Sequence, residues 1–288
     1  MLIQPQSFIR IAILMLGLVI SSTDLSWSAS LQAKPKVYQS PYSVTFSFPV
    51  ESLLGDILKG DRGNPKEQST KLYSEWYSDE VRKKYGVWGP PSKKFDPPTG
   101  LEGKSVAWKR ERVLAIGLRY VGYSYQHHHL PDWEPPTDWP WKEVGHGKNA
   151  KGVDCSNFTG FVYNLALGAK LSGDVRLQAA QTKVNVKDQD IPILELEKPK
   201  KYADCAKLFR TGDLLYIRNK EQEISHVIIW VGEIGHSPDK SPLILDSTGS
   251  NHKDSNGKTI PDGVNLRPFN EKGWYYNSLS HIHRIIPD

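Results

Sequence analysis

The chain has 288 residues, of which 24% are charged and 38% are hydrophobic, and it contains only two cysteines. This composition excludes global disorder and collagen-like repetition, and the length corresponds to one large domain or two small ones. A net charge of +5, spread along the chain, is too small to indicate a nucleic-acid-binding protein. Two cysteines cannot form a disulfide framework, so they form one bridge or one of them has a chemical role.

The first thirty residues have the organisation of a secretory signal peptide. One cation, Arg10, precedes an apolar run at 11–20, and small polar residues fill 21–30. The alternative is a membrane anchor, but the apolar run is about half of the roughly 20 residues that a membrane-spanning helix needs. We therefore expect residues 1–30 to be removed. The mature protein is then secreted or periplasmic, outside the cytoplasmic membrane, without stable membrane insertion.

Residues 31–104 mix charged and aromatic residues with turn formers. We expect an N-terminal extension or a small accessory region here. Within it, the apolar residues of 69–85 recur at nearly helical spacing and predict a short helix. Proline and glycine in residues 89–100 indicate a linker or a wrapping loop. We assign no chemistry to this region.

Two helices are predicted in the remaining part of the chain, residues 105–288. The first covers residues 105–123, has one apolar face and ends at Gly122. The second covers residues 154–168, because Asp154 is a good N-cap and a glycine follows the last apolar position.

Short β-branched segments follow the helices and predict strands. Turn residues separate these segments. Helices first and several strands after them indicate an α+β domain, in which helices pack on a central antiparallel sheet. The predicted strands are residues 213–218, 225–231, 243–247 and 281–286.

Cys155 is the most informative position, because it falls in the first turn of the helix that Asp154 caps. Unsatisfied backbone N–H groups and the helix dipole favour an anion there, and a thiolate is the form that attacks carbonyl carbons. The alternative is a buried cysteine that packs as a small hydrophobic residue. The other cysteine, Cys205, lies in a polar stretch and is expected to be a free or semi-buried thiol.

His226 lies near the start of an apolar strand, where packed neighbours would hold its ring. An imidazole beside the thiol would accept its proton and form a cysteine–histidine pair, whereas the alternative is a histidine satisfied by a backbone carbonyl. Asp246, in the next predicted strand, is in a position to orient the imidazole, since adjacent antiparallel strands bring side chains within reach. His252, in the following loop, is the rival for this role.

Three short motifs follow one another along the chain: Asp154-Cys155-Ser156, Gly212-Asp213-Leu214 and Ser225-His226-Val227. In this order they resemble the NlpC/P60 family of cell-wall cysteine peptidases, and the resemblance covers about residues 105–286. It implies a papain-like NlpC/P60 fold with the nucleophile at a helix N-terminus.

The same resemblance implies roles for individual residues. Cys155 would be the nucleophile, His226 the general base and Asp246 the third polar residue. Tyr125, together with the backbone N–H of Cys155, would help to stabilise the oxyanion. The residues expected to contact substrate are Asp154, Ser156, Trp133 and His127.

The chain departs from the family pattern at three places. Asn157 replaces the usual glycine two residues after the cysteine, and Gln126-His127-His128 replaces Trp-Gly-Gly. The third polar residue is commonly histidine and is Asp246 here, but an aspartate orients an imidazole equally well. These changes leave the identity of the substrate more open than the reaction class.

The loop at residues 127–151 is dense in histidine, proline and tryptophan. Its histidines raise the alternative of a zinc site. Neighbouring residues of an extended chain point in opposite directions, however, and no carboxylate or thiol lies at ligand spacing. We therefore expect structural or substrate-contacting roles, and no metal and no cofactor. The loop residues considered are His127, His128, His129 and His146, with Trp133, Trp139 and Trp141 as candidates for stacking on sugar rings or for packing.

The resemblance implies a secreted cysteine hydrolase that cleaves amide bonds in the peptide part of bacterial peptidoglycan, at γ-D-glutamyl-diamino acid bonds. Its partners would be peptidoglycan stem peptides and not nucleic acid, and we expect a monomer. Two alternatives remain open. One is a Cys-His-Asp amidase or peptidase that acts on another wall or non-wall substrate, and the other is an inactive wall-binding protein on the same fold.

Overall fold

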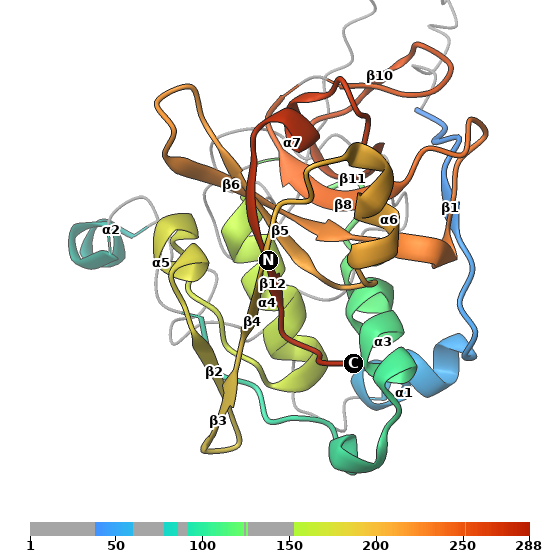
Figure 1. The fold of residues 1–288 in the computed structure, drawn as a ribbon. Coiled ribbons are helices and arrows are strands. Elements are labelled where there is room, and N and C mark those ends of the chain that lie inside the picture. Colours follow the sequence, from blue (N-terminus) through green and yellow to red (C-terminus); the bar gives the residue numbers. More distant parts are fainter. Residues whose placement is uncertain (1–37, 60–77, 86–91, 124, 126–152, 251) are drawn as a thin grey trace, which may run out of the picture. The chain divides into compact units, whose positions relative to one another are not determined.

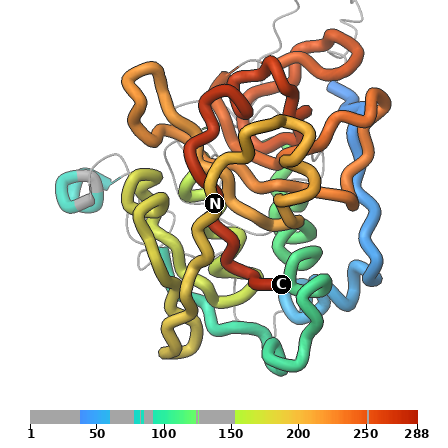
Figure 2. Tube along the Cα trace, viewed as in Figure 1, coloured from blue at the N-terminus to red at the C-terminus, as the bar shows by residue number. Residues whose placement is uncertain are grey.

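The structure is a computed structural model that describes residues 38–59, 78–85, 92–123, 125, 153–250 and 252–288. Residues 37–288 form one compact unit, which is shown in Figures 1 and 2. The predicted signal peptide, the loop at 127–151 and most of the predicted helix at 69–85 lie outside the described residues. Within the described residues, none of the helices combines the length and the apolar character that crossing a membrane would require.

A six-stranded sheet forms the centre of this unit, and every adjacent pair of strands is antiparallel. All the strands predicted from the sequence are present in it, and the fold is α+β, as predicted. The two edge strands were not predicted. In sheet order, the strands are β11 (Gly263–Pro268), β8 (Leu243–Thr248), β6 (Ile224–Trp230), β5 (Leu214–Arg218), β12 (Leu279–Arg284) and β4 (Leu194–Glu197).

Short helices and strand pairs surround the sheet (Figure 1). Three two-stranded pairs are β1 (Ser43–Val44) with β7 (Gly235–His236), β2 (Lys183–Val186) with β3 (Gln189–Pro192), and β9 (His252–Lys253) with β10 (Thr259–Ile260). The helices are α1 (Val50–Leu58), α2 (Asp79–Tyr85), α3 (Val106–Leu118), α4 (Cys155–Leu167), α5 (Val175–Ala179), α6 (Cys205–Leu208) and α7 (Trp274–Asn277), with 3₁₀ turns at Leu101–Gly103, Tyr202–Asp204 and Gly232–Ile234.

The sheet separates two hydrophobic clusters, because successive residues of a strand point to opposite faces. In β5, Leu214 and Tyr216 join the cluster that includes residues of α3 and α4. Leu215 and Ile217 join the second cluster, which includes residues of α6 and α7. Since β5 is buried on both faces, its sequence is continuously apolar rather than alternating.

Helix α4 begins and ends where the sequence predicts. The Asp154 carboxylate accepts a hydrogen bond from the backbone N–H of Asn157 at 2.8 Å, and Gly168 ends the helix with φ of 71°. Helix α3, in contrast, ends at Leu118, before the predicted Gly122. Gly122 instead has φ of 97° in the following turn, and its N–H donates to the carbonyl of Val264 in β11. Gly122 is therefore part of a turn that is hydrogen-bonded to the sheet. Helical periodicity in the sequence could not indicate this contact.

The segment before residue 60 packs into the same core. Helix α1 buries three apolar side chains and pairs Asp56 with the fully buried Arg112 of α3 at 2.7 Å. The carboxylate of Glu111 accepts the backbone N–H of Ser47 at 2.8 Å. The predicted division of the chain at residue 104 stays a prediction, but residues 38–58 share one hydrophobic core with α3 and α4.

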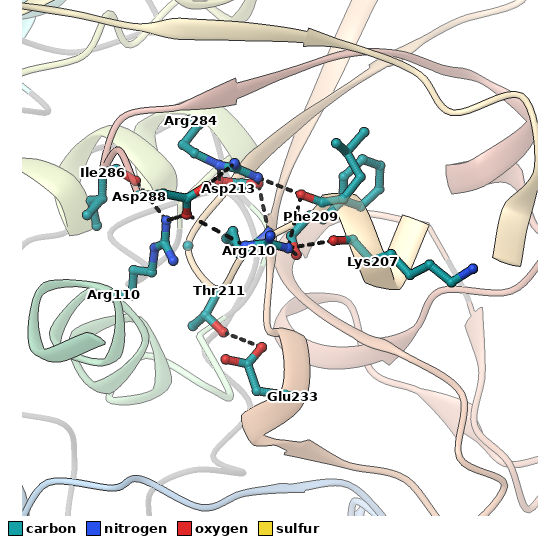
Figure 3. Close-up of polar contacts among 12 residues, drawn as sticks. Arg110, Lys207, Phe209, Arg210, Thr211, Asp213, Glu233, Arg284, Ile286 and Asp288 are labelled. Carbon is teal, nitrogen blue, oxygen red and sulfur yellow. Dashed lines mark hydrogen bonds and ion pairs between the residues drawn. The ribbon is translucent and has the colours of Figure 1, made fainter. Parts of the chain in front are cut away.

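The Gly212-Asp213-Leu214 motif fixes the start of β5. The Asp213 carboxylate accepts hydrogen bonds from Nη2 of Arg284 at 2.8 Å and from the backbone N–H of Arg210 at 2.9 Å (Figure 3). Arg284 is the last residue of β12, so this buried ion pair joins two neighbouring strands. The motif therefore has a structural role: it holds the start of β5 beside β12.

Gly168 provides a test of the helix end. A Cβ atom at this position would lie 2.8 Å from the backbone nitrogen of Pro97, whereas a Cβ at Gly257 would meet nothing within 4 Å. Both glycines have positive φ, so alanine costs about 1–2 kcal/mol of strain at either site. The clash adds about 1–3 kcal/mol only at residue 168. In denaturant unfolding, Gly168→Ala should therefore lose clearly more stability than Gly257→Ala, and equal losses would contradict this packing.

Candidate active site

The first turn of α4 holds Cys155 in a tightly built cap. Cys155 is the first helical residue and is only 4% exposed. The side chain of Asn157 donates to the Asp154 carboxylate at 2.8 Å, and the Ser156 hydroxyl donates to the carbonyl of Gly173 at 2.6 Å. Asp154 and Ser156 are thus buried parts of the cap, and their predicted contact with substrate stays a prediction.

Asn157 is accommodated by a compensating glycine. A Cβ atom at Gly173 would lie 2.7 Å from Oδ1 of Asn157, so only glycine fits opposite this side chain. The departure from the family pattern at Asn157 therefore adds a hydrogen bond to the helix cap, and the segment that faces it is adapted to its size.

His226 and Asp246 come from neighbouring strands and contact each other directly. Nε2 of His226 lies 2.9 Å from Oδ2 of Asp246. Strands β6 and β8 are antiparallel, and Ile229 pairs with Leu245. When this register is extended, Asp246 lies two residues away from the β8 position that is opposite His226. Such diagonal neighbours share one face of a sheet, within reach of long side chains. Both residues lie beyond the last paired residues of these strands.

Asp246 is completely buried and accepts two further hydrogen bonds. Nε of Arg267 donates to Oδ1 at 2.8 Å, and the hydroxyl of Tyr275 donates to Oδ2 at 2.8 Å. Burial by itself raises the pKa of Asp246, but the charge of Arg267 and the hydrogen bond from His226 outweigh it and hold the pKa below its usual value. The carboxylate is therefore ionised and faces the imidazole as an anion.

The Cys155 thiol is the second group that acts on the imidazole, because it contributes to the pKa shift of His226. Burial by itself lowers the pKa of His226. Interactions with Cys155 and Asp246, both of charge and of hydrogen bonding, act in the opposite direction and raise the pKa to about 10. The imidazole is therefore protonated at neutral pH.

His252, the rival third residue, lies one step further from His226. Its Nε2 is 3.1 Å from the hydroxyl of Tyr275, and the two rings stack with centroids 4.9 Å apart. His252 therefore reaches Asp246 through Tyr275. The residue in direct contact with His226 is Asp246.

Tyr125 lies near the same charges. Burial raises the pKa of its phenol, and the charges of Cys155, Asp154 and Asp246 raise it further. The phenol is therefore a neutral O–H group, which is the form that donates a hydrogen bond. Trp133 and His127, the other two predicted substrate contacts, lie outside the described residues.

Three residues of this site were not predicted from the sequence: Arg267, Tyr275 and Trp274. Arg267 lies on β11, whose alternation of apolar and polar residues in V-N-L-R is a signal that was available. Tyr275 and Trp274 belong to the short helix α7, and neither has a sequence signal of its own. The Trp274 ring is 5.5 Å from the His226 ring and remains 38% exposed.

Cys205 is separate from the site. It is a free thiol and lies in the second hydrophobic cluster, only 1% exposed. Burial raises its pKa to about 11, so it is a neutral thiol at physiological pH.

Fold and site together define an α+β protein in which a thiol at a helix N-terminus meets a buried imidazole–carboxylate pair. The sequence model of the NlpC/P60 family matches residues 143–282. This part of the chain therefore matches the NlpC/P60 family, as the motif resemblance predicted.

Several solved structures are similar to the chain. An NlpC/P60 family protein from Bacillus cereus shares 15% identity, over 62% of this chain and 40% of that one, with a TM-score of 0.37. NlpC1 from Trichomonas vaginalis shares 15% identity, over 61% of this chain and 44% of that one, with a TM-score of 0.33. RipB from Mycobacterium tuberculosis, a peptidoglycan hydrolase, shares 16% identity over 84% and 92%, with a TM-score of 0.39.

The match spans less than half of the first two of these structures. No curated protein matches the chain.

The protonation of His226 is directly measurable. Because Cys155 contributes to the raised pKa of about 10, Cys155→Ala should move the loss of the imidazolium proton to lower pH, while burial continues to favour the neutral ring. The measurement is a pH titration of the His226 ring by nitrogen-15 NMR. Cys205→Ala is the matched control and should leave the titration unchanged. An identical titration in wild type and Cys155→Ala would show that the thiol does not interact with the imidazole.

Proposed function

We propose that this protein is a cysteine hydrolase that opens amide bonds through an acyl-enzyme. One observation supports this most strongly: the buried imidazole of His226 is hydrogen-bonded to the Asp246 carboxylate and interacts with the Cys155 thiol. A nucleophile, a general base and a group that orients the base are the three parts that nucleophilic acyl transfer needs. The proposed catalytic residues are Cys155 and His226, with Asp246 as the residue that positions His226.

In the proposed reaction, the Cys155 thiolate attacks the amide carbonyl carbon, and a bond between sulfur and carbon forms. The His226 imidazolium then gives its proton to the leaving amine as the C–N bond breaks. Neutral His226 next takes a proton from water, whose oxygen attacks the thioester and releases the acid. Throughout both steps, Asp246 holds the ring in place and stabilises its positive charge.

The oxyanion of each tetrahedral intermediate needs hydrogen-bond donors. The backbone N–H groups in the first turn of α4 have no acceptor one turn earlier in the helix, and the helix dipole favours negative charge there. The Tyr125 hydroxyl, kept neutral by its raised pKa, is the proposed second donor. Removal of one such donor costs about 10²–10³-fold in turnover in other hydrolases.

We propose peptidoglycan stem peptides as the substrate, and γ-D-glutamyl-diamino acid bonds as the bonds that are cut. The support is the NlpC/P60 resemblance of residues 143–282 and the signal-like N-terminus, which would direct the chain to the compartment of the wall. The exposed Trp274 beside His226 offers an aromatic surface for the substrate next to the reacting atoms.

The alternative of an inactive wall-binding protein is less well supported by the site. A buried carboxylate such as Asp246 is costly to desolvate, and replacing a buried ion pair by apolar residues is often neutral or stabilising. Catalysis gives a reason for keeping Asp246, Arg267 and Cys155 together that wall binding does not supply. The alternative of another amide substrate keeps the same three-residue mechanism.

Digestion of purified peptidoglycan tests the proposal. The mature protein should release fragments whose new termini, identified by mass spectrometry, are a D-glutamyl carboxylate and a diamino acid amine. Cys155→Ala should lose turnover by about 10⁴-fold or more, because it removes the nucleophile. Cys205→Ala is the matched control and should keep the activity.

Three results would count against parts of this account. Fragments with other termini would favour the alternative amide substrate. Equal digestion by wild type and Cys155→Ala would contradict the assignment of the nucleophile. A pure, folded wild-type protein without any hydrolytic activity would favour the wall-binding alternative.

A further inference from the structure

A second cluster of titratable side chains lies near the opposite edge of the sheet, on β12 and β4. It consists of His281, His283 and Glu195, and each residue offers a ligand atom within 4.8 Å of the others. The two histidines are on one face of β12, and Glu195 is directly opposite His283 in the register with β4. We propose that these three residues bind a zinc ion, a site that is independent of the proposed catalytic residues.

His283 is the strongest indication of a metal site. Its side chain is only 1% exposed, and neither ring nitrogen has a hydrogen-bond partner among the residues that the structure describes. Oε2 of Glu195 is 3.8 Å from Nε2 of His283, which is too far for a hydrogen bond. A buried polar group without a partner costs about 1–3 kcal/mol. A metal ion between Nε2 and the Glu195 carboxylate would supply the missing partner.

His281 is already oriented as a metal-binding histidine. Its Nε2 is 3.2 Å from the carbonyl oxygen of Ala179. Histidines that bind metals usually donate their other ring N–H to such a carbonyl, which fixes the tautomer and the ring. Nδ1 is then the ligand atom, once the hydroxyl of Ser280 at 3.0 Å rotates away. The Tyr216 ring stacks on His281 at 4.9 Å and limits its movement.

Glu195 gives an ion access to the site. Its side chain is 66% exposed, so the carboxylate can move and can exchange water for a metal. Ligand atoms about 2.1 Å from a tetrahedral zinc lie about 3.4 Å apart, so ligand atoms that are up to 4.8 Å apart need to approach by at most about 1.4 Å. Since the two imidazoles are held by packing, the exposed carboxylate makes most of this movement.

The donor set selects zinc over the abundant alkaline-earth ions. Two imidazoles and one carboxylate, with water as fourth ligand, are a common set for zinc, whereas calcium and magnesium prefer oxygen ligands. The ion would join β4, an edge strand, to β12 in the interior of the sheet. Its expected effect is therefore on stability, and it takes no part in the proposed hydrolysis.

Calorimetric titration with zinc chloride tests the site. The protein used is the full mature chain carrying Cys155→Ala, which removes the thiol as a competing ligand, after treatment with a chelator. Glu195→Gln in this background should weaken zinc binding at this site by at least about tenfold. The matched control is Glu197→Gln, because Glu197 lies on the same strand and the same face but outside the cluster. It should bind zinc as the parent does.

Thermal unfolding gives a second readout, in which the comparison of the two variants separates this site from other zinc ligands of the chain. Zinc should raise the unfolding temperature of the parent and of Glu197→Gln, but not that of Glu195→Gln. Glu195 is exposed, so its replacement should leave the fold intact, as circular dichroism can verify. Zinc binding and zinc stabilisation that are equal in Glu195→Gln and Glu197→Gln would overturn the proposal. So would a parent that zinc does not stabilise.

Discussion

The buried negative charge of Asp246 is the constraint on which the rest of the site depends. An isolated carboxylate inside a protein is strongly unfavourable, so it must be surrounded by donors from several elements. Arg267 of β11, His226 of β6 and Tyr275 of α7 supply these donors, each within 2.9 Å. The charge can be buried only when these three elements are in place around β8. Asp246 therefore couples the formation of the site to the formation of the sheet.

This arrangement gives the imidazole a fixed direction. Because Nε2 of His226 is bound to Asp246, Nδ1 is the nitrogen left for Cys155. The thiol is fixed from the other side by the cap of α4, in which Asp154 and Asn157 bond to each other. The nucleophile and its base thus belong to two rigid elements, a capped helix and a central strand. Reacting groups on such elements keep their geometry better than groups on loops.

Most of the helices and strands around the site could be predicted from local signals. Helix α4 has a capping aspartate and a terminating glycine, and the central strands are short β-branched runs between turn residues. Edge strand β4 could not, because its residues are mostly exposed and pairing with β12 determines it, whereas the alternation in β11 was a local signal that the prediction missed. Local patterns also could not reveal the role of Gly122, which forms a turn that contacts β11 and does not end a helix.

Contacts between residues far apart in the sequence account for what was missed. The roles of Arg267 and Tyr275 can be recognised only in the folded sheet, in which β8 and β11 are paired. In the same way, the pairing of β4 with β12 brings Glu195 next to His283. The motifs around Cys155 and His226 were visible because each is local. Thus a sequence can indicate the reacting groups, whereas the residues that position them follow from the topology of the sheet.

The reactivity of Cys155 tests the central role of Asp246 most directly. The rate of alkylation by iodoacetamide at neutral pH should fall by at least about tenfold in Asp246→Asn, because the imidazolium that stabilises the thiolate loses its buried partner. The comparison needs an Asp246→Asn protein whose circular dichroism matches wild type. It also needs Asp239→Asn as a control, since Asp239 lies in an exposed turn away from His226. Cys205 should stay unlabelled in all three proteins, and an unchanged rate at Cys155 in Asp246→Asn would contradict the account.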